Sequence, residues 1–247
     1  MQPRVAHTAA ALIVGNELLS GKVPEGNLIE LARTLRALGV ELRRAVILGD
    51  DVAAMAREIR ELSDSHDVVF TSGGVGPTHD DRTVEAVALA FGVPVVADPD
   101  LRDIIAKAWG ASCTDAHFLM ARVPQGSVLA MSAEVEWPTP VMRNVFILPG
   151  VPEAFRAKLT TIRRWVKGPR PFVTKAAFTL LDEPALKPLL DQVVQAHPSV
   201  EVGSYPRWFE PSYKTKVTFD GQDPALVEAA FGDFVRSLPE SALVRSE

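Results

Sequence analysis

The sequence predicts a doubly wound α/β domain with a mostly parallel sheet, followed by a second, smaller α+β domain. The first observation is that short apolar runs alternate with segments whose apolar residues recur every three or four positions. The second is that the runs are apolar throughout, which is typical of strands buried on both faces. The third is that the pattern changes after a proline-rich segment at residues 167–171, which predicts a linker. We therefore expect domains at residues 1–167 and 168–247.

The elements of the first domain follow in order along the chain. Strands are expected at the apolar runs 9–14, 46–48, 68–70 and 145–148. Helices are expected at 28–38, 52–62, 84–91 and 153–165. Gly39 marks the end of the first helix. The less regular stretch 92–144 predicts helices at 101–109 and 115–121 and a short β excursion at 128–135.

The second domain has a different order of elements. Strands are expected at 172–181, 200–205, 213–219 and 242–244, and helices at 184–196 and 224–238. The order β-α-β-β-α-β is that of a small split βαβ sandwich. Ferredoxin-like and KH-like nucleic-acid binders share this order. This part of the chain, however, has more acidic than basic residues and no Gly-x-x-Gly loop, which argues against that function.

Composition narrows the possible partners and surroundings of the protein. The chain has 247 residues and a formal net charge of -5, and neither domain is basic, so we expect no nucleic-acid partner. No apolar stretch approaches the roughly 20 residues of a membrane span, so we expect no membrane insertion. The single cysteine, Cys113, excludes an intramolecular disulfide and argues against a thiolate zinc site. These features predict a cytoplasmic protein.

The most informative motif covers residues 71–83, Thr-Ser-Gly-Gly-Val-Gly-Pro-Thr-His-Asp-Asp-Arg-Thr, between a predicted strand and a predicted helix. Its glycines let the backbone approach a ligand closely, and their N–H groups, with the helix N-terminus, form an anion site. Two adjacent carboxylates, Asp80 and Asp81, suit such a site if a cation bridges them, as Mg²⁺ does between carboxylates and phosphates. The alternative is a simple turn, because Thr78 and Asp81 have the spacing of a capping box. The spacing matches neither Walker A nor the dinucleotide fingerprint.

Three other polar or glycine-containing turns follow predicted strands. The turn at 15–21 contains Glu17, which is either a metal ligand or base or an exposed loop acid, and Asn27 is a helix cap or a ligand contact. Asp50-Asp51 follows the second strand, and either aspartate could simply cap the next helix. The turn at 148–153 begins its helix with N–H groups that could hold a second anion. Because ligands bind at the carboxyl ends of the strands in open α/β sheets, we expect the four turns to form one site.

Taken together, these motifs resemble the molybdopterin-binding-like domain of the CinA (competence/damage-inducible protein A) family. That domain is similar to the MoaB/Mog molybdopterin adenylyltransferases and to the N-terminal half of eukaryotic FAD synthases. The motifs that carry the resemblance are Gly15–Gly21 with Asn27, Gly49-Asp50, Gly73–Thr83 and Leu148–Pro152. The segments Gly203–Pro206 and Lys214–Thr218 resemble the small domain that follows it, especially in the FAD synthase version. The resemblance covers nearly the whole chain and implies a MoaB/Mog-like fold.

The resemblance also implies roles for individual residues. Asp81 falls where Mog-type proteins keep a catalytic aspartate, and Asp50 falls on their other functional aspartate. Asp80 takes the place of an arginine in Mog-type proteins, which favours metal-assisted hydrolysis over adenylyl transfer to molybdopterin. The divalent metal (Mg, Mn or Co) is expected at Glu17, Asp80 and Asp81. The residues expected to bind phosphate or nucleotide are Ser72, Gly73, Gly74, Gly76, Thr78, Asn27, Gly150 and Pro152.

The leading expectation is therefore a metal-dependent nucleotide pyrophosphatase, a hydrolase that cleaves ADP-ribose, FAD or a similar dinucleotide and forms a homodimer. The alternatives are a molybdopterin-binding or adenylyl-transfer protein of molybdenum cofactor biosynthesis, with a pterin substrate, and a non-catalytic nucleotide-binding module. Asn16 and Glu25-Gly26 depart from the family pattern at positions that concern substrate contacts. Because the chain ends at Glu247, we expect neither the deamidase domain of many CinA proteins nor the FAD-forming half of FAD synthases.

Overall fold

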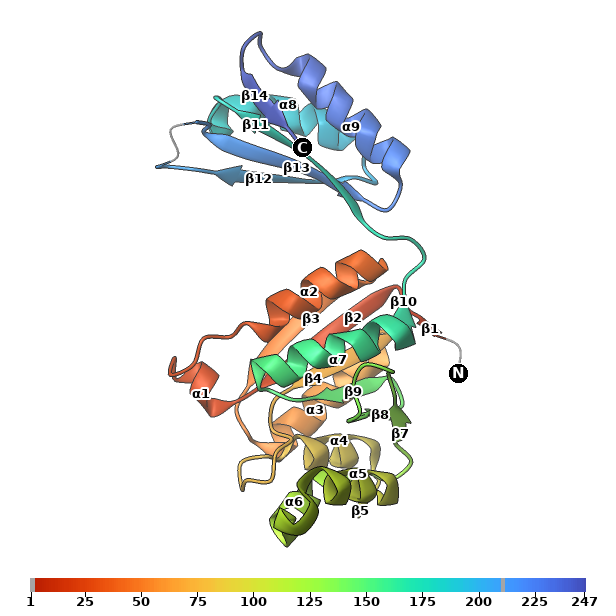
Figure 1. Ribbon diagram of the computed structural model, residues 1–247. Helices are drawn as coiled ribbons and strands as arrows, with labels where there is room; N and C mark the ends of the chain where they lie inside the picture. Colours follow the sequence, from red (N-terminus) through yellow and green to blue (C-terminus); the bar gives the residue numbers. More distant parts are fainter. Residues whose placement is uncertain (1–2, 210–211) are drawn as a thin grey trace. The chain divides into compact units, whose positions relative to one another are not determined.

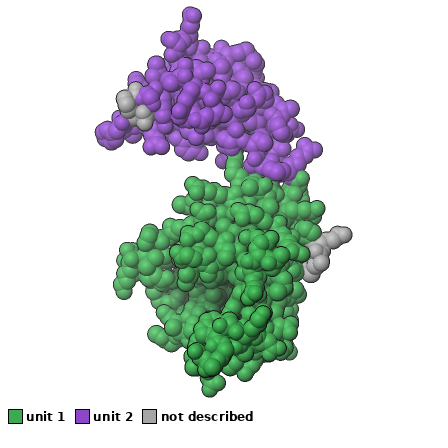
Figure 2. All heavy atoms as spheres, viewed as in Figure 1, with its two compact units in different colours: residues 1–169 green, residues 170–247 purple. Residues whose placement is uncertain are grey.

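The chain is divided into two compact units, each with its own main sheet. The computed structural model describes residues 3–209 and 212–247, and the units are Met1–Pro169 (unit 1) and Arg170–Glu247 (unit 2) (Figure 2). Among the described residues, no helix has the length and apolar character needed to cross a membrane. The two units are described separately below.

The main sheet of unit 1 has the strand order β3-β2-β4-β9-β8-β7. Its strands are β2 (Thr8–Val14), β3 (Glu41–Leu48), β4 (Val68–Ser72), β7 (Val128–Ala130), β8 (Thr139–Met142) and β9 (Val145–Leu148). Strands β3, β2, β4 and β9 run parallel, whereas β8 and β7 pair antiparallel. The predicted mostly parallel sheet is confirmed, and the carboxyl ends of its four parallel strands lie at one edge (Figure 1).

Helices cover both faces of this sheet, and each face has its own core (Figure 1). The helices are α2 (Asn27–Leu38), α3 (Val52–Ser65), α4 (Thr83–Phe91) and α7 (Pro152–Trp165), with a short α1 (Asn16–Leu19) after β2. Helices α2 and α7 contribute to one core, and α3 and α4 contribute to the other. Strand β2 serves both, because its odd positions from Ala9 to Ile13 belong to the first core and its even positions from Ala10 to Val14 to the second. The doubly wound architecture is confirmed, and burial on both faces explains the uniformly apolar strand.

Between α4 and β7 the chain forms an excursion with a small core of its own. Its elements are β5 (Val95–Ala97), α5 (Pro99–Trp109), η1 (Gly110–Ser112), α6 (Asp115–Phe118), η2 (Leu119–Ala121) and β6 (Arg122–Pro124). The helical stretch predicted at 115–121 is confirmed: a capping box between Thr114 and His117 starts α6, and the chain tightens into the 3₁₀ turn η2 after it. The β excursion predicted at 128–135 is shorter and ends with β7.

The first residues of the predicted linker belong to unit 1. β10 (Val166–Lys167) pairs in parallel with β1 (Arg4–Val5), and the Gly168 N–H donates to the Leu38 carbonyl at 2.7 Å. A Cβ at Gly168 would lie 2.0 Å from the carbonyl oxygen of Gly39, so this close approach requires glycine. The chain is therefore fixed to unit 1 up to Gly168.

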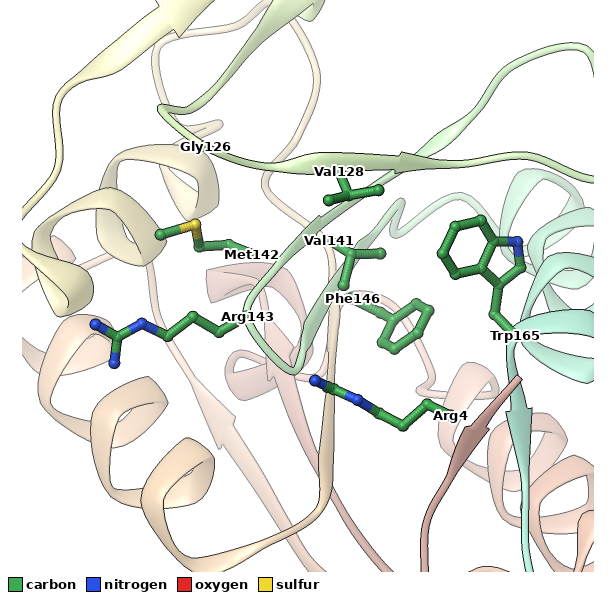
Figure 3. Close-up of a pocket in the computed structure, with 8 residues that line it drawn as sticks. All are labelled: Arg4, Gly126, Val128, Val141, Met142, Arg143, Phe146 and Trp165. Atoms are coloured by element: carbon green, nitrogen blue, oxygen red, sulfur yellow. The ribbon is translucent and has the colours of Figure 1, made fainter. Parts of the chain in front are cut away.

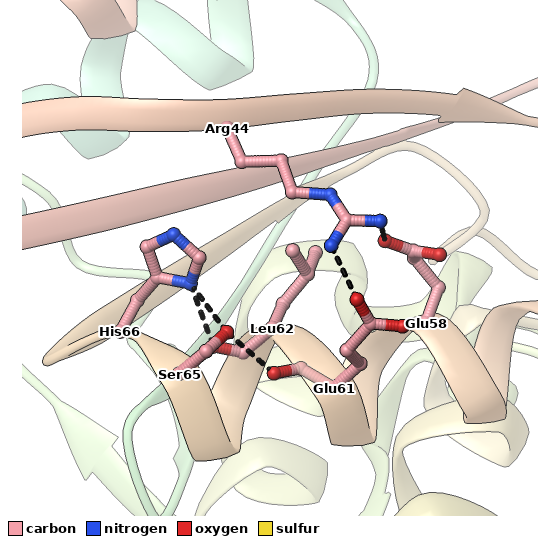
Figure 4. Close-up of polar contacts among 6 residues, drawn as sticks. All are labelled: Arg44, Glu58, Glu61, Leu62, Ser65 and His66. Carbon is pink, nitrogen blue, oxygen red and sulfur yellow. Dashed lines mark hydrogen bonds and ion pairs between the residues drawn. The ribbon is translucent and has the colours of Figure 1, made fainter.

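The outer strand β3 is connected to α3 by exposed ion pairs (Figure 4). Arg44 lies 2.9 Å from a carboxylate oxygen of Glu58 and 2.5 Å from one of Glu61. Exposed pairs of this kind contribute little to stability, but they place charge along the unpaired edge of the sheet. This edge of unit 1 is consequently a polar surface.

Unit 2 has a four-stranded antiparallel sheet with two helices on one face (Figure 1). Its elements are β11 (Val173–Thr179), α8 (Glu183–Ala196), β12 (Glu201–Pro206), β13 (Thr215–Gly221), α9 (Pro224–Ser237) and β14 (Leu243–Ser246). The strand order is β12-β13-β11-β14, and the predicted β-α-β-β-α-β sequence of elements is confirmed. Both helices pack on the sheet through a core that contains Leu186, Val193, Val227 and Phe234. Among the described residues of unit 2, no helix covers the opposite face of the sheet.

Candidate functional site

The turns that follow β2, β3, β4 and β9 meet at one edge of the sheet of unit 1. Backbone hydrogen bonds join neighbouring turns to neighbouring strands: Gly15 N–H donates to the Leu48 carbonyl at 3.0 Å, and Gly73 N–H donates to the Leu148 carbonyl at 3.2 Å. Because all four strands are parallel neighbours, the turns emerge on the same side. The convergence expected from the sequence is found in the structure.

Asn27 connects two of these turns from the start of α2. Its side-chain amide donates to Ser72 Oγ at 3.0 Å and to the Gly150 carbonyl at 2.8 Å, and the residue is buried. The cap of α2 comes instead from Glu25, whose carboxylate accepts from the Leu28 N–H at 3.1 Å. The interpretation of Asn27 as a helix cap is therefore wrong. Glu25 was not predicted to act here, because a cap from two residues before the helix has no fixed sequence signature.

Backbone contact between turns explains part of the glycine-rich motif. Gly73 has a φ of +104°, and a Cβ on it would lie 2.2 Å from the Val14 carbonyl oxygen. A Cβ on Gly150 would lie 3.0 Å from Gly73 Cα. Side chains at these two positions would separate the turns, so both glycines are required by the fold itself.

The rest of the loop is fixed against the start of α4. The buried Thr83 hydroxyl donates to the Gly73 carbonyl at 2.7 Å, and the Thr83 N–H donates to the Gly74 carbonyl at 2.9 Å. Gly73 uses its own N–H within the fold, whereas the N–H groups of Gly74 and Gly76 donate to no acceptor in the described residues. Of the glycines in this motif, Gly74 and Gly76 therefore keep free donors for an anion, and Thr83 is a loop-positioning residue that was not among those predicted.

The paired aspartates close a turn just before α4. Thr78 N–H donates to Asp81 Oδ2 at 2.8 Å, and the Thr78 hydroxyl lies 2.5 Å from carboxylate oxygens of both Asp80 and Asp81. A hydroxyl carries one proton, so it satisfies one of these carboxylates at a time. The same hydroxyl lowers the pKa of Asp80. The helix begins only at Thr83, so the spacing that resembled a capping box marks a separate turn.

Asp50 and Asp51 have different environments although they are adjacent. Asp51 is the N-cap of α3 and accepts from the Ala54 N–H at 2.7 Å. Asp50 accepts from the side-chain amide of Asn16 at 2.6 Å. Its pKa is raised, first because it is partly buried and then because Glu17, Asp80 and Asp81 place negative charge nearby. Asp50 therefore faces the same edge of the sheet as the other three carboxylates.

The four carboxylates form no ion pair with a described lysine or arginine, and this electrostatic imbalance fits a divalent cation. The described residues contain no group of three or more His, Cys, Asp or Glu side chains that could hold a metal by themselves. The Glu17 carboxylate folds back over Gly15, where a Cβ would lie 2.4 Å from its Oε1. Mg²⁺ is commonly held by one or two carboxylates and completed by phosphate oxygens, which suits this edge.

Residues 10–167 match the family described as "Probable molybdopterin binding domain". The chain belongs to this family. Residues 171–247 match a second family, described as "FAD synthase, middle domain". The two matches correspond closely to the two compact units of the structure.

Proteins with sequences similar to this member of the family include CinA proteins. A protein of Archaeoglobus fulgidus is 33% identical over 224 residues, 90% of this chain and 93% of the relative. A CinA-like protein of Myxococcus xanthus is 38% identical over 155 residues, 60% of this chain and 37% of that protein. The solved structure of CinA from Thermoplasma acidophilum is 33% identical with a TM-score of 0.57, covering 62% of this chain and 94% of the other. The chain spans about half the length of the probable FAD synthases of Caenorhabditis that it matches. The resemblance to the CinA family and to FAD synthases is confirmed.

A cavity of about 290 Å³ lies elsewhere in the molybdopterin-binding-family unit (Figure 3). The residues that line it are Arg4, Gly126, Val128, Val141, Met142, Arg143, Phe146 and Trp165. It includes the turn between β8 and β9, at the amino end of β9, whereas the converging turns lie at the carboxyl ends of the parallel strands. None of the predicted site residues lines this cavity, so the candidate site is the open edge with its carboxylates and glycines.

Proposed function

We propose that the chain is a divalent-metal-dependent nucleotide pyrophosphatase that cleaves the diphosphate of ADP-ribose, FAD or a similar dinucleotide. The observation that carries this proposal is the gathering of four carboxylates, those of Asp50, Glu17, Asp80 and Asp81, at one edge of the sheet. These negative charges lie next to a loop whose free N–H groups suit an anion. Carboxylates and a diphosphate can occupy neighbouring positions only when a cation lies between them.

Different residues at this edge of the sheet would bind the phosphates and the cation. Gly74 and Gly76 would donate their N–H groups to phosphate oxygens at the start of α4. Asp80, Asp81 and Glu17 would hold the cation together with the phosphates. A divalent cation, when bound, neutralises the diphosphate and lowers the pKa of a bound water.

Asp50 would act as the base that accepts the proton of the attacking water. Asp50 is partly buried beside the other three carboxylates, so a water held by the cation would lie within its reach. The amide of Asn16 holds one carboxylate oxygen of Asp50 at 2.6 Å and leaves the other available. Asn16, a departure from the family pattern, thereby acquires a positioning role in this proposal.

The test is hydrolysis of ADP-ribose, FAD and NAD with Mg²⁺, Mn²⁺ or Co²⁺, measured as AMP release, for the wild type, Asp50→Asn and Asp51→Asn. Asp50→Asn should lower the rate by about 10²-fold or more, because a general base contributes that much. Asp51→Asn is the matched control: it changes a neighbouring aspartate that only caps α3, so the rate should stay within a few-fold of wild type. Equal rates for all three proteins, or no AMP release by the wild type, would reject the proposal.

The name of the matched family favours a second candidate, a protein that binds molybdopterin or joins AMP to it. Both functions would use the same edge, because both need a phosphate site and carboxylates. Product analysis separates them: the first releases AMP from a dinucleotide, and the second consumes a nucleotide to form a pterin adduct. Formation of that adduct without AMP release from any dinucleotide would support the second candidate.

A further inference from the structure

A separate feature lies in unit 2, on the face of its sheet that the helices leave uncovered. Phe178 and Lys216 point to this face, since their chain neighbours Ala177 and Val217 belong to the core under the helices. Strand register places Tyr205 opposite Lys216, Lys216 opposite Phe178 and Phe178 opposite Arg245. One residue from each of the four strands thus forms a line across the sheet, which we call the Tyr205–Arg245 row.

Two cations of this row lie against an aromatic ring. Lys216 Nζ lies 5.3 Å and Arg245 Cζ lies 4.0 Å from the centre of the Phe178 ring, and Tyr213 meets the same ring edge-on at 4.9 Å. Lys216 has no carboxylate partner in the described part of the chain, and Arg245 has an exposed pair with Glu247 at 3.5 Å. The row therefore presents positive charge that the protein neutralises only weakly.

Beside the Tyr205–Arg245 row, the next line of residues across the sheet has small side chains. Gly203, Thr218 and Ala176 are opposite one another in register. A Cβ on Gly203 would lie 2.9 Å from the Tyr205 ring and 2.9 Å from Thr218 Oγ1, so the Tyr205 ring lies along the glycine. Thr218 is 7% exposed, and its buried hydroxyl has no hydrogen-bond partner. The small side chains of this line thus leave room for the Tyr205 ring to lie against the sheet.

We propose that this face of unit 2 binds a nucleoside phosphate, with the base stacked on Tyr205 and the phosphate between Lys216 and Arg245. Tyr205 is 54% exposed, so one side of its ring is supported by Gly203 and the rest is open to a ligand. Stacking on an aromatic side chain combined with nearby cations is the usual way in which sheet surfaces hold bases and phosphates.

The distribution of charged residues in unit 2 favours a single nucleotide over a nucleic acid as the ligand. Unit 2 has more acidic than basic residues, and a long polyanion gains affinity only from many cations. The line beyond the small residues contains Glu201 and Asp220, which would repel a second phosphate there. The positive charge is confined to the Tyr205–Arg245 row, which matches one phosphate group. This proposal does not depend on hydrolysis in unit 1.

The test is calorimetric titration of the full chain with AMP, adenosine and ribose 5-phosphate, without divalent metal. Lys216→Met should raise the Kd for AMP by about tenfold, a difference of about 1.4 kcal/mol. Tyr205→Leu should weaken AMP and adenosine but not ribose 5-phosphate, and Lys216→Met should weaken AMP and ribose 5-phosphate but not adenosine. This pattern would show that Tyr205 binds the base and Lys216 binds the phosphate.

Lys175→Met is the matched control, because Lys175 lies on β11 but on the helix-covered face, where it pairs with Glu228 at 2.9 Å. It should leave the Kd for AMP within twofold of wild type, and thermal melting of each variant should confirm that it is folded. Equal AMP affinity in wild type, Lys216→Met and Tyr205→Leu would overturn the proposal and leave the hydrolysis proposal untouched. A single-stranded oligonucleotide that binds much more tightly than AMP would also overturn it, in favour of a nucleic-acid surface.

Discussion

Replacement of Lys158 by methionine should change how the stability of unit 1 depends on pH. Lys158 lies on α7 and is 6% exposed, with no carboxylate partner among the described residues. Its ammonium donates to the carbonyls of Trp137 and, at 3.0 Å, Pro138. Burial lowers its pKa from 10.5 to about 8.

The sign of the effect follows from proton binding. Between about pH 8 and 10.5 the unfolded chain holds the Lys158 proton and the folded chain does not, so the free energy of unfolding rises with pH in this window. The gap between the two pKa values corresponds to a rise of about 3 kcal/mol. Lys158→Met removes this contribution, so the stability difference between wild type and variant should grow in favour of the wild type as pH increases from 7 to 10.5.

The assay is urea unfolding followed by tryptophan fluorescence across this pH range. Lys187→Met is the control, because Lys187 is an exposed helical lysine paired with Asp191 and should show no comparable change. A difference between wild type and Lys158→Met that stays constant from pH 7 to 10.5 would refute the argument. It would mean that water or structural relaxation solvates the buried ammonium.

Further predictions concern the site and the ends of the sheet. Asp81→Asn should lower dinucleotide hydrolysis by about 10²-fold, which is roughly 3 kcal/mol in the barrier, and raise the metal concentration needed for half-maximal rate; an unchanged rate and metal dependence would remove Asp81 from the catalytic residues. Asp67 accepts from the backbone N–H of Thr8, which lowers its pKa, so its stabilisation is present above about pH 4. It should be lost as pH falls through the lowered value, and urea unfolding of Asp67→Asn should lack that acid dependence. Gly73→Ala should destabilise unit 1 by about 1–3 kcal/mol in urea unfolding, because its backbone is left-handed. Gly76→Ala should mainly displace the Asp81 carboxylate, 2.6 Å from the new Cβ, and lower activity more than stability; the opposite order of effects would contradict this assignment.

The fold was predictable because the two main patterns in the sequence, apolar runs and apolar residues at every third or fourth position, both result from burial. Strand β2 has a core on each face, so every position from Ala9 to Val14 is apolar and the run is visible without a structure. Helices α2 and α3 each bury one side, which gives the recurrence at every third or fourth residue. The excursion at 92–144 was less predictable, since its short elements pack on a small local core and carry no long period.

The functions of neighbouring aspartates could not be separated from sequence, because they depend on where a helix begins. Asp50 and Asp51 have the same chemistry, and a shift of one residue in the start of α3 would exchange their roles. In the structure Asp51 has its carboxylate on the N–H of Ala54, so Asp50 is left to face Asn16 and the other carboxylates. Thr78 and Asp81 pose the same problem. Their spacing of three residues allows hydrogen bonds between them both in an isolated turn and in a helix cap, so the sequence alone does not distinguish the two.

The glycine-rich motif combines two requirements that sequence analysis treats as alternatives. Gly73 is needed where two turns meet backbone to backbone, and its N–H is already bonded to Leu148. Gly74 and Gly76, within the same turn, keep N–H groups that the described residues do not use. Packing accounts for Gly73, whose Cβ would meet the Val14 carbonyl at the end of β2, but it does not account for the unused N–H groups of Gly74 and Gly76. The packing glycine therefore fixes the loop in place, and the two later glycines of the same loop keep their N–H groups free for an anion.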